Sequence, residues 1–230
     1  MKLVLFDIDG TILWSDGAGR RAMQRALMTA FGTSGSAEYR YDGKTDKQIV
    51  RDLMRMEGHR DDVIDARMAA VFADYVSGLH EELRSGETKV QRFDGVIELL
   101  DALEARADRR IGLLTGNIEV GAYAKLRAVD IDPARFIVSA FGSDHEIRGE
   151  LPGIAQRRAR EQLGLQVDGD AIVIIGDTPA DIDCTRAIGA RAIAVATGRY
   201  SVEQLADHGP VAVFTDLADT DAVMRAIDAA

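Results

Sequence analysis

Apolar runs alternate with amphipathic segments over most of this chain, and the alternation has the spacing of a strand–helix repeat. Helical periodicity connects the apolar runs at 96–107, 121–128, 152–163, 179–189 and 202–208. Such alternation predicts a mostly parallel sheet with right-handed crossovers and helices on both faces. The predicted strands are Leu3–Ile8, Ile111–Thr115, Phe136–Ala140, Ala171–Gly176, Ala192–Thr197 and Val211–Phe214.

Residues 14–89 have a different pattern, with apolar side chains at helical spacing and no convincing strand. Met23, Leu27 and Phe31 illustrate this spacing. We therefore predict an α/β core made of residues 1–13 and 90–230, with a helical domain inserted at 14–89. The connections near Leu13–Asp16 and Val90–Gly95 are the expected hinges.

Composition narrows the possible partners and location. A net charge of −10 without a basic stripe argues against nucleic acid. No apolar run is long enough to span a membrane, and the first strand leaves no room for a signal peptide. The single Cys184 excludes an intrachain disulfide and favours a reducing cytoplasm. We expect the Cys184 thiol to be buried. We expect the protein to be a monomer, with a dimer as the alternative.

Acidic residues follow two of the predicted strands. Asp7 and Asp9 come directly after the run Leu3–Phe6, and Asp177 and Asp181 follow the run ending at Gly176. An Asp-Gly pair alone would favour a simple turn. Two acidic strand ends together indicate a divalent cation site, because buried carboxylates need a cation or many donors and parallel strands end at one ligand-binding edge.

Three motifs resemble those of the haloacid dehalogenase superfamily, in its phosphatase branch. They are Asp7-Ile8-Asp9-Gly10-Thr11, Leu114-Thr115-Gly116-Asn117 and Gly176-Asp177-Thr178-Pro179-Ala180-Asp181, in the family's order. The resemblance implies a Rossmann-like doubly wound parallel sheet with an inserted α-helical cap. It further implies a Mg²⁺-dependent phosphoric monoester hydrolase similar to the phosphoglycolate phosphatases.

The resemblance also assigns roles to the acidic residues. Asp7 would be the nucleophile, forming an aspartyl-phosphate, and also a Mg²⁺ ligand. Asp9 would be the general acid–base, with its backbone carbonyl on the metal. Asp177 would be the third protein ligand, and Asp181 would bind the metal directly or hold a metal-bound water.

The phosphate group would be held by the second motif and by a cation. Thr115, Gly116 and Asn117 form a strand-to-helix turn whose hydroxyl and N–H groups suit an anion. The third family motif usually supplies a Lys, which is absent from the segment 146–153. Arg148 is the candidate replacement, and Arg157 and Arg158 are the alternatives.

Substrate choice is expected to depend on the inserted helices. The pattern Asp42-Gly43-Lys44-Thr45-Asp46 by itself favours a simple capped loop. Because the resemblance implies that cap loops close over the substrate, Lys44 is a candidate contact to the organic part of a small phosphorylated metabolite. A phosphosugar mutase resembling β-phosphoglucomutase is the alternative enzyme. A non-catalytic module that binds a phosphorylated ligand is a third possibility, which the retained acidic cluster disfavours.

Overall fold

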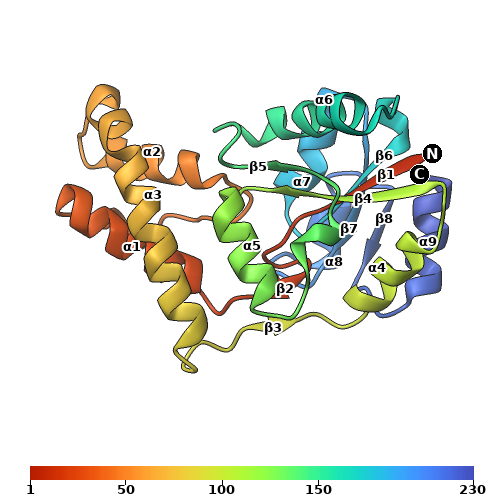
Figure 1. The fold of residues 1–230 in the computed structure, drawn as a ribbon, viewed down its shortest axis with the longest axis horizontal. Helices are drawn as coiled ribbons and strands as arrows, with labels where there is room; N and C mark the ends of the chain where they lie inside the picture. Colours follow the sequence, from red (N-terminus) through yellow and green to blue (C-terminus); the bar gives the residue numbers. More distant parts are fainter.

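Six parallel strands form one sheet in the order β5-β4-β1-β6-β7-β8 (Figure 1). The computed structural model describes residues 1–230. This arrangement confirms the predicted α/β fold. The strands are β1 (Lys2–Phe6), β4 (Arg109–Thr115), β5 (Val138–Phe141), β6 (Ile172–Gly176), β7 (Arg191–Val195) and β8 (Ala212–Phe214).

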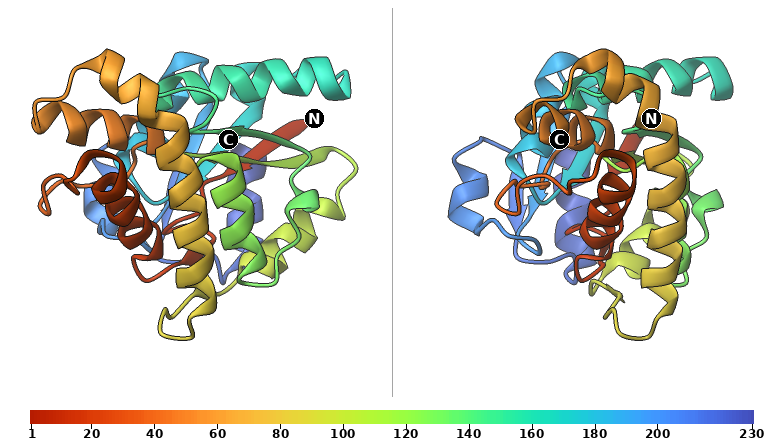
Figure 2. Two further views of the ribbon diagram at one scale, coloured as in Figure 1. Left: turned by 60° about the vertical axis from the view of Figure 1, so that its left-hand side comes forward. Right: turned by 90° about the vertical axis from the view of Figure 1, so that its left-hand side faces the viewer.

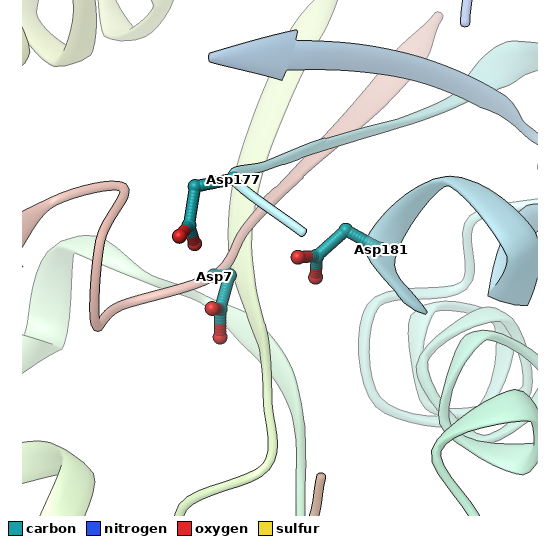
Figure 3. A group of neighbouring side chains, drawn as sticks. All are labelled: Asp7, Asp177 and Asp181. Carbon is teal, nitrogen blue, oxygen red and sulfur yellow. The ribbon is translucent and has the colours of Figure 1, made fainter. Parts of the chain in front are cut away.

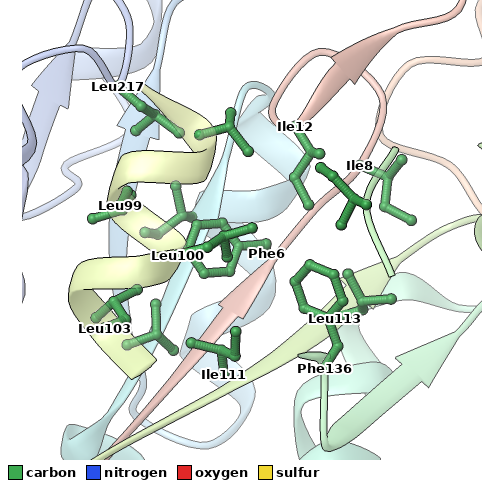
Figure 4. Packing of buried hydrophobic residues seen from close by; sticks show 14 of the residues in the cluster. Phe6, Ile8, Ile12, Leu99, Leu100, Leu103, Ile111, Leu113, Phe136 and Leu217 are labelled. Atoms are coloured by element: carbon green, nitrogen blue, oxygen red, sulfur yellow. The ribbon is translucent and has the colours of Figure 1, made fainter. Parts of the chain in front are cut away.

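Alternate residues of β1 pack against opposite layers of helices. Val4 and Phe6 belong to a cluster with buried side chains of α4 (Val96–Glu104), α5 (Glu119–Arg127) and α9 (Thr220–Ala229) (Figure 4). Leu3 and Leu5 instead join a second cluster with α6 (Leu151–Leu163). The strand is thus apolar on both faces because helices cover both faces. The remaining core helices are α7 (Pro179–Asp183) and α8 (Val202–Ala206), with short 3₁₀ turns at Pro133–Arg135, Arg148–Glu150, Gly169–Ala171 and Cys184–Ala187.

Three helices lie beside the sheet and form their own apolar cluster (Figures 1 and 2). They are α1 (Ala18–Phe31), α2 (Asp46–Met56) and α3 (Asp61–Arg84). Ile118 and Ala124, next to and within α5, complete this cluster, so α5 joins the three helices to the sheet. The chain enters and leaves this region through two short antiparallel strands, β2 (Leu13–Trp14) and β3 (Gln91–Arg92).

Several element boundaries differ from the sequence predictions. The predicted strand Phe136–Ala140 begins two residues later, at Val138. The 3₁₀ turn Pro133–Arg135 ends at Phe136, whose ring packs edge-on against the Phe6 ring with 6.5 Å between the ring centres. The predicted helix over 179–189 is α-helical only to Asp183 and continues as a 3₁₀ turn. Neither the β2–β3 pair nor α9 was predicted. No helix meets the length and hydropathy needed to cross a membrane.

Candidate active site

The central position of β1 brings three motif residues to one edge of the sheet. β1 pairs with β4 on one side and with β6 on the other, so Asp7, Thr115 and Asp177 emerge at adjacent carboxyl ends. The Asp7 N–H still donates to the Ile175 carbonyl at 2.9 Å, which fixes the start of the turn. A cavity of about 200 Å³ opens above these ends, lined by residues from the sheet edge and from the three additional helices.

Three buried carboxylates meet at these strand ends, and two of them, Asp7 and Asp177, line the cavity. Asp7, Asp177 and Asp181 each offer an oxygen, and these oxygens lie within 4.8 Å of one another (Figure 3). Burial, together with the Asp181 and Asp9 charges, raises the pKa of Asp7 to about 6. Burial and the same mutual repulsion raise the pKa of Asp177 well above its usual value. Burial and mutual repulsion therefore disfavour the state in which all three acids are ionised.

Arg148 is the one basic side chain that reaches this cluster. Its Nη2 lies 3.3 Å from Asp7 Oδ1 and also contacts Asp181. Burial lowers the pKa of Arg148, but the Asp181 and Asp7 carboxylates outweigh it and raise the pKa overall. Of the alternatives, Arg158 pairs with Asp144 at 2.6 Å, and Arg157 is exposed on α6.

Asp181 is held differently from the other two acids. Its Oδ2 accepts hydrogen bonds from the Thr178 N–H at 3.0 Å and from the Thr178 hydroxyl at 2.6 Å, in a capping box at the start of α7. Its Oδ1 accepts from Arg148. Both oxygens are therefore engaged, whereas Asp177 accepts only the long 3.3 Å hydrogen bond from the Thr11 hydroxyl among side-chain donors.

Close packing around Asp177 explains a glycine in the first motif. Gly10 has φ +87°, and a Cβ there would lie 2.2 Å from Asp177 Oδ2. Any other residue would be strained and would displace the carboxylate. Gly10 thus allows the turn after β1 to pass directly beside the acid at the end of β6.

Asp9 lies in a separate group of polar side chains. The Ser15 hydroxyl donates to its Oδ1 at 3.0 Å, and the Asn117 amide donates to its Oδ2 at 2.8 Å. Desolvation alone would raise the pKa of Asp9, but the nearby Lys125 ammonium and these hydrogen bonds hold it below the usual value. Asp9 is therefore stabilised in its ionised form.

Lys125 is the residue that sequence analysis missed. It lies on α5, and its Nζ donates to Asp9 Oδ2 at 2.5 Å and to Asn117 Oδ1 at 2.6 Å. The only sequence signal is its position eight residues, just over two helical turns, after Asn117. That spacing does not distinguish a lysine facing the site from one in solvent.

The loop before α2 packs against the turn Thr115–Asn117. A Cβ on Gly116 would lie 2.0 Å from the Lys44 carbonyl oxygen, so this glycine permits the close approach. The Asp46 N–H donates to the Gly116 carbonyl, and the Ile118 N–H donates to Asp46 Oδ2, both at 2.8 Å. The Lys44 side chain lines the cavity, with Nζ 3.9 Å from the Tyr39 ring centre and 3.7 Å from Asp52.

The acidic cluster fits a hard divalent cation. Its donors are three carboxylates from two chain segments, and only one cation, Arg148, opposes their charge. An ion among them would lower the raised pKa values of Asp7 and Asp177. Cys184 is buried as predicted but is not a member of this cluster, and its thiol donates to the Asp181 carbonyl at 3.2 Å.

Comparisons with known proteins identify a relative of this chain and solved structures with the same fold. The chain is 28% identical over 222 residues to phosphoglycolate phosphatase of Rhodospirillum rubrum, covering 94% of this chain and 88% of that protein. A hydrolase from Pseudomonas syringae has the same fold, with a TM-score of 0.74 and 20% identity over 98% of both chains. CbbY from Rhodobacter sphaeroides, solved in complex with phosphate, has a TM-score of 0.70 and 20% identity over 95% of this chain and 96% of its own.

The match to the family itself extends over most of the sequence. The family model described as haloacid dehalogenase-like hydrolase matches residues 4–186, which include all three motifs. The predictions of the family and of a hydrolytic enzyme are confirmed, and the phosphatase identity of the curated relative agrees with the predicted phosphoric monoester hydrolase. The chain belongs to the haloacid dehalogenase-like hydrolases.

Proposed function

We propose that this protein is a Mg²⁺-dependent phosphatase that hydrolyses a small phosphorylated metabolite, phosphoglycolate-like or a sugar phosphate, through an aspartyl-phosphate on Asp7. The observation that carries the proposal is the contact between Asp7 and Arg148 inside the buried acidic cluster, at the base of a cavity that Thr115 and Asn117 also line. A nucleophilic carboxylate, a cation and anion-binding donors thus face one space. Phosphoryl transfer needs this combination.

In the first half-reaction, Asp7 attacks the phosphorus atom. The bond to the leaving oxygen breaks, and this oxygen takes a proton that Asp9, ionised in the free protein, first takes up from solvent and then passes on. Arg148 and the turn Thr115–Asn117 neutralise and orient the phosphoryl oxygens. In the second half-reaction, water attacks the phosphorus, Asp9 takes a proton from that water, and the Asp7 carboxylate is released.

Asp7, Asp177 and the Asp9 carbonyl would hold the Mg²⁺ ion. When bound, the ion would reduce the charge repulsion between the anionic nucleophile and the phosphoryl group. Asp181, whose oxygens already accept from Thr178 and Arg148, would bind it through an intervening water molecule. Magnesium commonly keeps several waters, so a short list of protein ligands suits it.

The substrate class follows from the cavity. Its volume of about 200 Å³ suits a small metabolite, and its lining also contains Lys44, Arg20 and Tyr41. We propose that residues 14–89 act as a cap over a core of residues 1–13 and 90–230, with Lys44 contacting the organic part of the substrate. The cytoplasmic location and monomeric state remain predictions from the sequence.

The test is release of inorganic phosphate from a panel of phosphorylated two- to six-carbon metabolites, with Mg²⁺ and with EDTA. Phosphate release that depends on Mg²⁺ and on Asp7 supports the proposal. Isomerisation of a sugar phosphate without phosphate release would instead identify the mutase. Binding of phosphorylated compounds with no turnover under any metal condition would identify a non-catalytic module.

A further inference from the structure

Lys125 is a buried lysine with two polar partners in the proposed site. Its side chain is 4% exposed, and its Nζ contacts Asp9 Oδ2 and Asn117 Oδ1 at 2.5 and 2.6 Å. Burying an ammonium group costs several kcal/mol unless hydrogen-bonded partners compensate it. Gly19 of α1 leaves room for the group, because a Cβ there would lie 3.3 Å from Nζ. The space for this cation is therefore shaped by elements of both the sheet edge and the helical insertion.

The three side chains close a hydrogen-bonded triangle. Asn117 Nδ2 donates to Asp9 Oδ2 at 2.8 Å, while its Oδ1 accepts from Lys125. The same Nδ2 also donates to the Thr115 hydroxyl oxygen at 2.8 Å. Lys125, which can only donate, thus fixes which end of the Asn117 amide faces Asp9. These hydrogen bonds fix the Asp9 carboxylate relative to the proposed phosphate-binding turn Thr115–Asn117.

We infer that Lys125 is a positioning residue for the dephosphorylation step, holding Asp9 where it accepts a proton from the attacking water. The inference rests on the proposed function. In this step the water oxygen forms a bond to phosphorus, the bond from phosphorus to Asp7 breaks, and one water proton passes to Asp9. Lys125 contacts Asp9 and Asn117 and acts through them.

The test uses Lys125→Met with 4-nitrophenyl phosphate and Mg²⁺. This leaving group departs without a proton, so formation of the phosphoenzyme does not require Asp9, and the defect falls on the second step. We expect kcat to fall by about 10- to 100-fold, less than the roughly 10²–10⁴-fold that a general acid–base contributes, because Asp9 itself is still present. KM should fall in proportion, leaving kcat/KM unchanged, because kcat/KM reports only steps up to phosphoenzyme formation. A burst of nitrophenol should precede the slow steady state.

A purely structural role predicts a different result. Loss of folded enzyme lowers kcat and kcat/KM equally and gives no burst. Lys89→Met, at an exposed lysine that does not line the cavity, is the matched control and should behave as the wild type. Gly19→Ala is the second variant, since alanine suits helix α1 and crowds the ammonium group directly. It should show the same split between kcat and kcat/KM, with a smaller loss.

Two results in Lys125→Met and Gly19→Ala would overturn the inference while leaving the proposed function intact. One is an equal loss of kcat and kcat/KM in both variants, and the other is no loss in either variant. Failure of the proposed function has a separate signature. In that case the wild-type protein itself would release no nitrophenol and form no phosphoenzyme, whatever the state of Lys125.

Discussion

Arg148 Nη2 lies 3.3 Å from Asp7 Oδ1, and the same nitrogen reaches Asp181 and, at 3.5 Å, the Leu114 carbonyl oxygen. One guanidinium nitrogen thus joins the ends of β1 and β4 to the start of α7. Because a single nitrogen makes these contacts, a compact ammonium group could replace it. We therefore predict that a lysine at position 148 would supply most of the same counter-charge.

Replacing Arg148 by Met should leave the acidic cluster without its counter-charge. We expect a loss of about 3–5 kcal/mol in the metal-free free energy of unfolding, and about 10²–10³-fold in kcat. Arg148→Lys should retain most of the free energy of unfolding and most of the kcat of the wild type. The control is Arg157→Met, at an exposed arginine on α6. If urea unfolding and turnover of Arg148→Met matched this control, the assignment of the third motif would be wrong.

Magnesium should stabilise the fold as well as support activity. Ion binding relieves the repulsion that raises the pKa values of Asp7 and Asp177. At about 100 times the dissociation constant, the ion should add about 2.7 kcal/mol, seen as a higher melting temperature. Asp177→Asn should greatly reduce this shift. Calcium should also bind, yet support turnover poorly, because it prefers more oxygen ligands and looser geometry. A melting temperature unaffected by Mg²⁺ would contradict the site.

Stability should depend on pH through Asp46. Burial raises its pKa to about 6, against the opposing Lys125 charge and the Ile118 N–H. The folded state therefore holds this proton more tightly than the unfolded state. The resulting stability is present below about pH 4 and is lost as pH rises through about 6, by up to about 3 kcal/mol.

Asp46→Asn isolates this effect, because the amide oxygen can still accept from Ile118 while nothing titrates. Urea unfolding of both proteins at about pH 4 and about pH 7.5, in EDTA, gives the comparison. Relative to the variant, the wild type should be more stable at the lower pH. A difference that is constant, or that grows with pH, would show that Asp46 is not buried in this way.

Lys44→Ala should affect substrates unequally. Lys44 lines the same cavity as the acids, so its loss should raise KM for the natural metabolite. A generic aryl phosphate owes little to such contacts and should be affected less. Steady-state kinetics on both compounds make the comparison. Equal losses would place Lys44 in support of the loop, and no loss on either would make it a solvated lysine.

The strand ends and their acids could be predicted from sequence because each depends on a local pattern. A buried apolar run followed by Asp7 or Asp177 predicts both the strand and the edge of the sheet at which its acid lies. Arg148 could be proposed from its place before α6. Lys125 could not, because its role depends on the angle at which α5 crosses the sheet edge and on the room left by Gly19. The β2–β3 pair escaped prediction because two-residue strands have no periodicity to detect.

The central claim is the covalent role of Asp7, and its most direct test is to trap the phosphorylated protein. Asp9→Asn should slow dephosphorylation by about 10²–10⁴-fold, since it removes the general base while keeping its volume. Acid quench after mixing this variant with substrate and Mg²⁺, followed by peptide mass spectrometry, should find one phosphoryl group on Asp7. The double variant Asp7→Asn/Asp9→Asn should carry none. Phosphate release by Asp7→Asn at the wild-type rate, with no phosphoryl group on Asp7 in Asp9→Asn, would contradict the account.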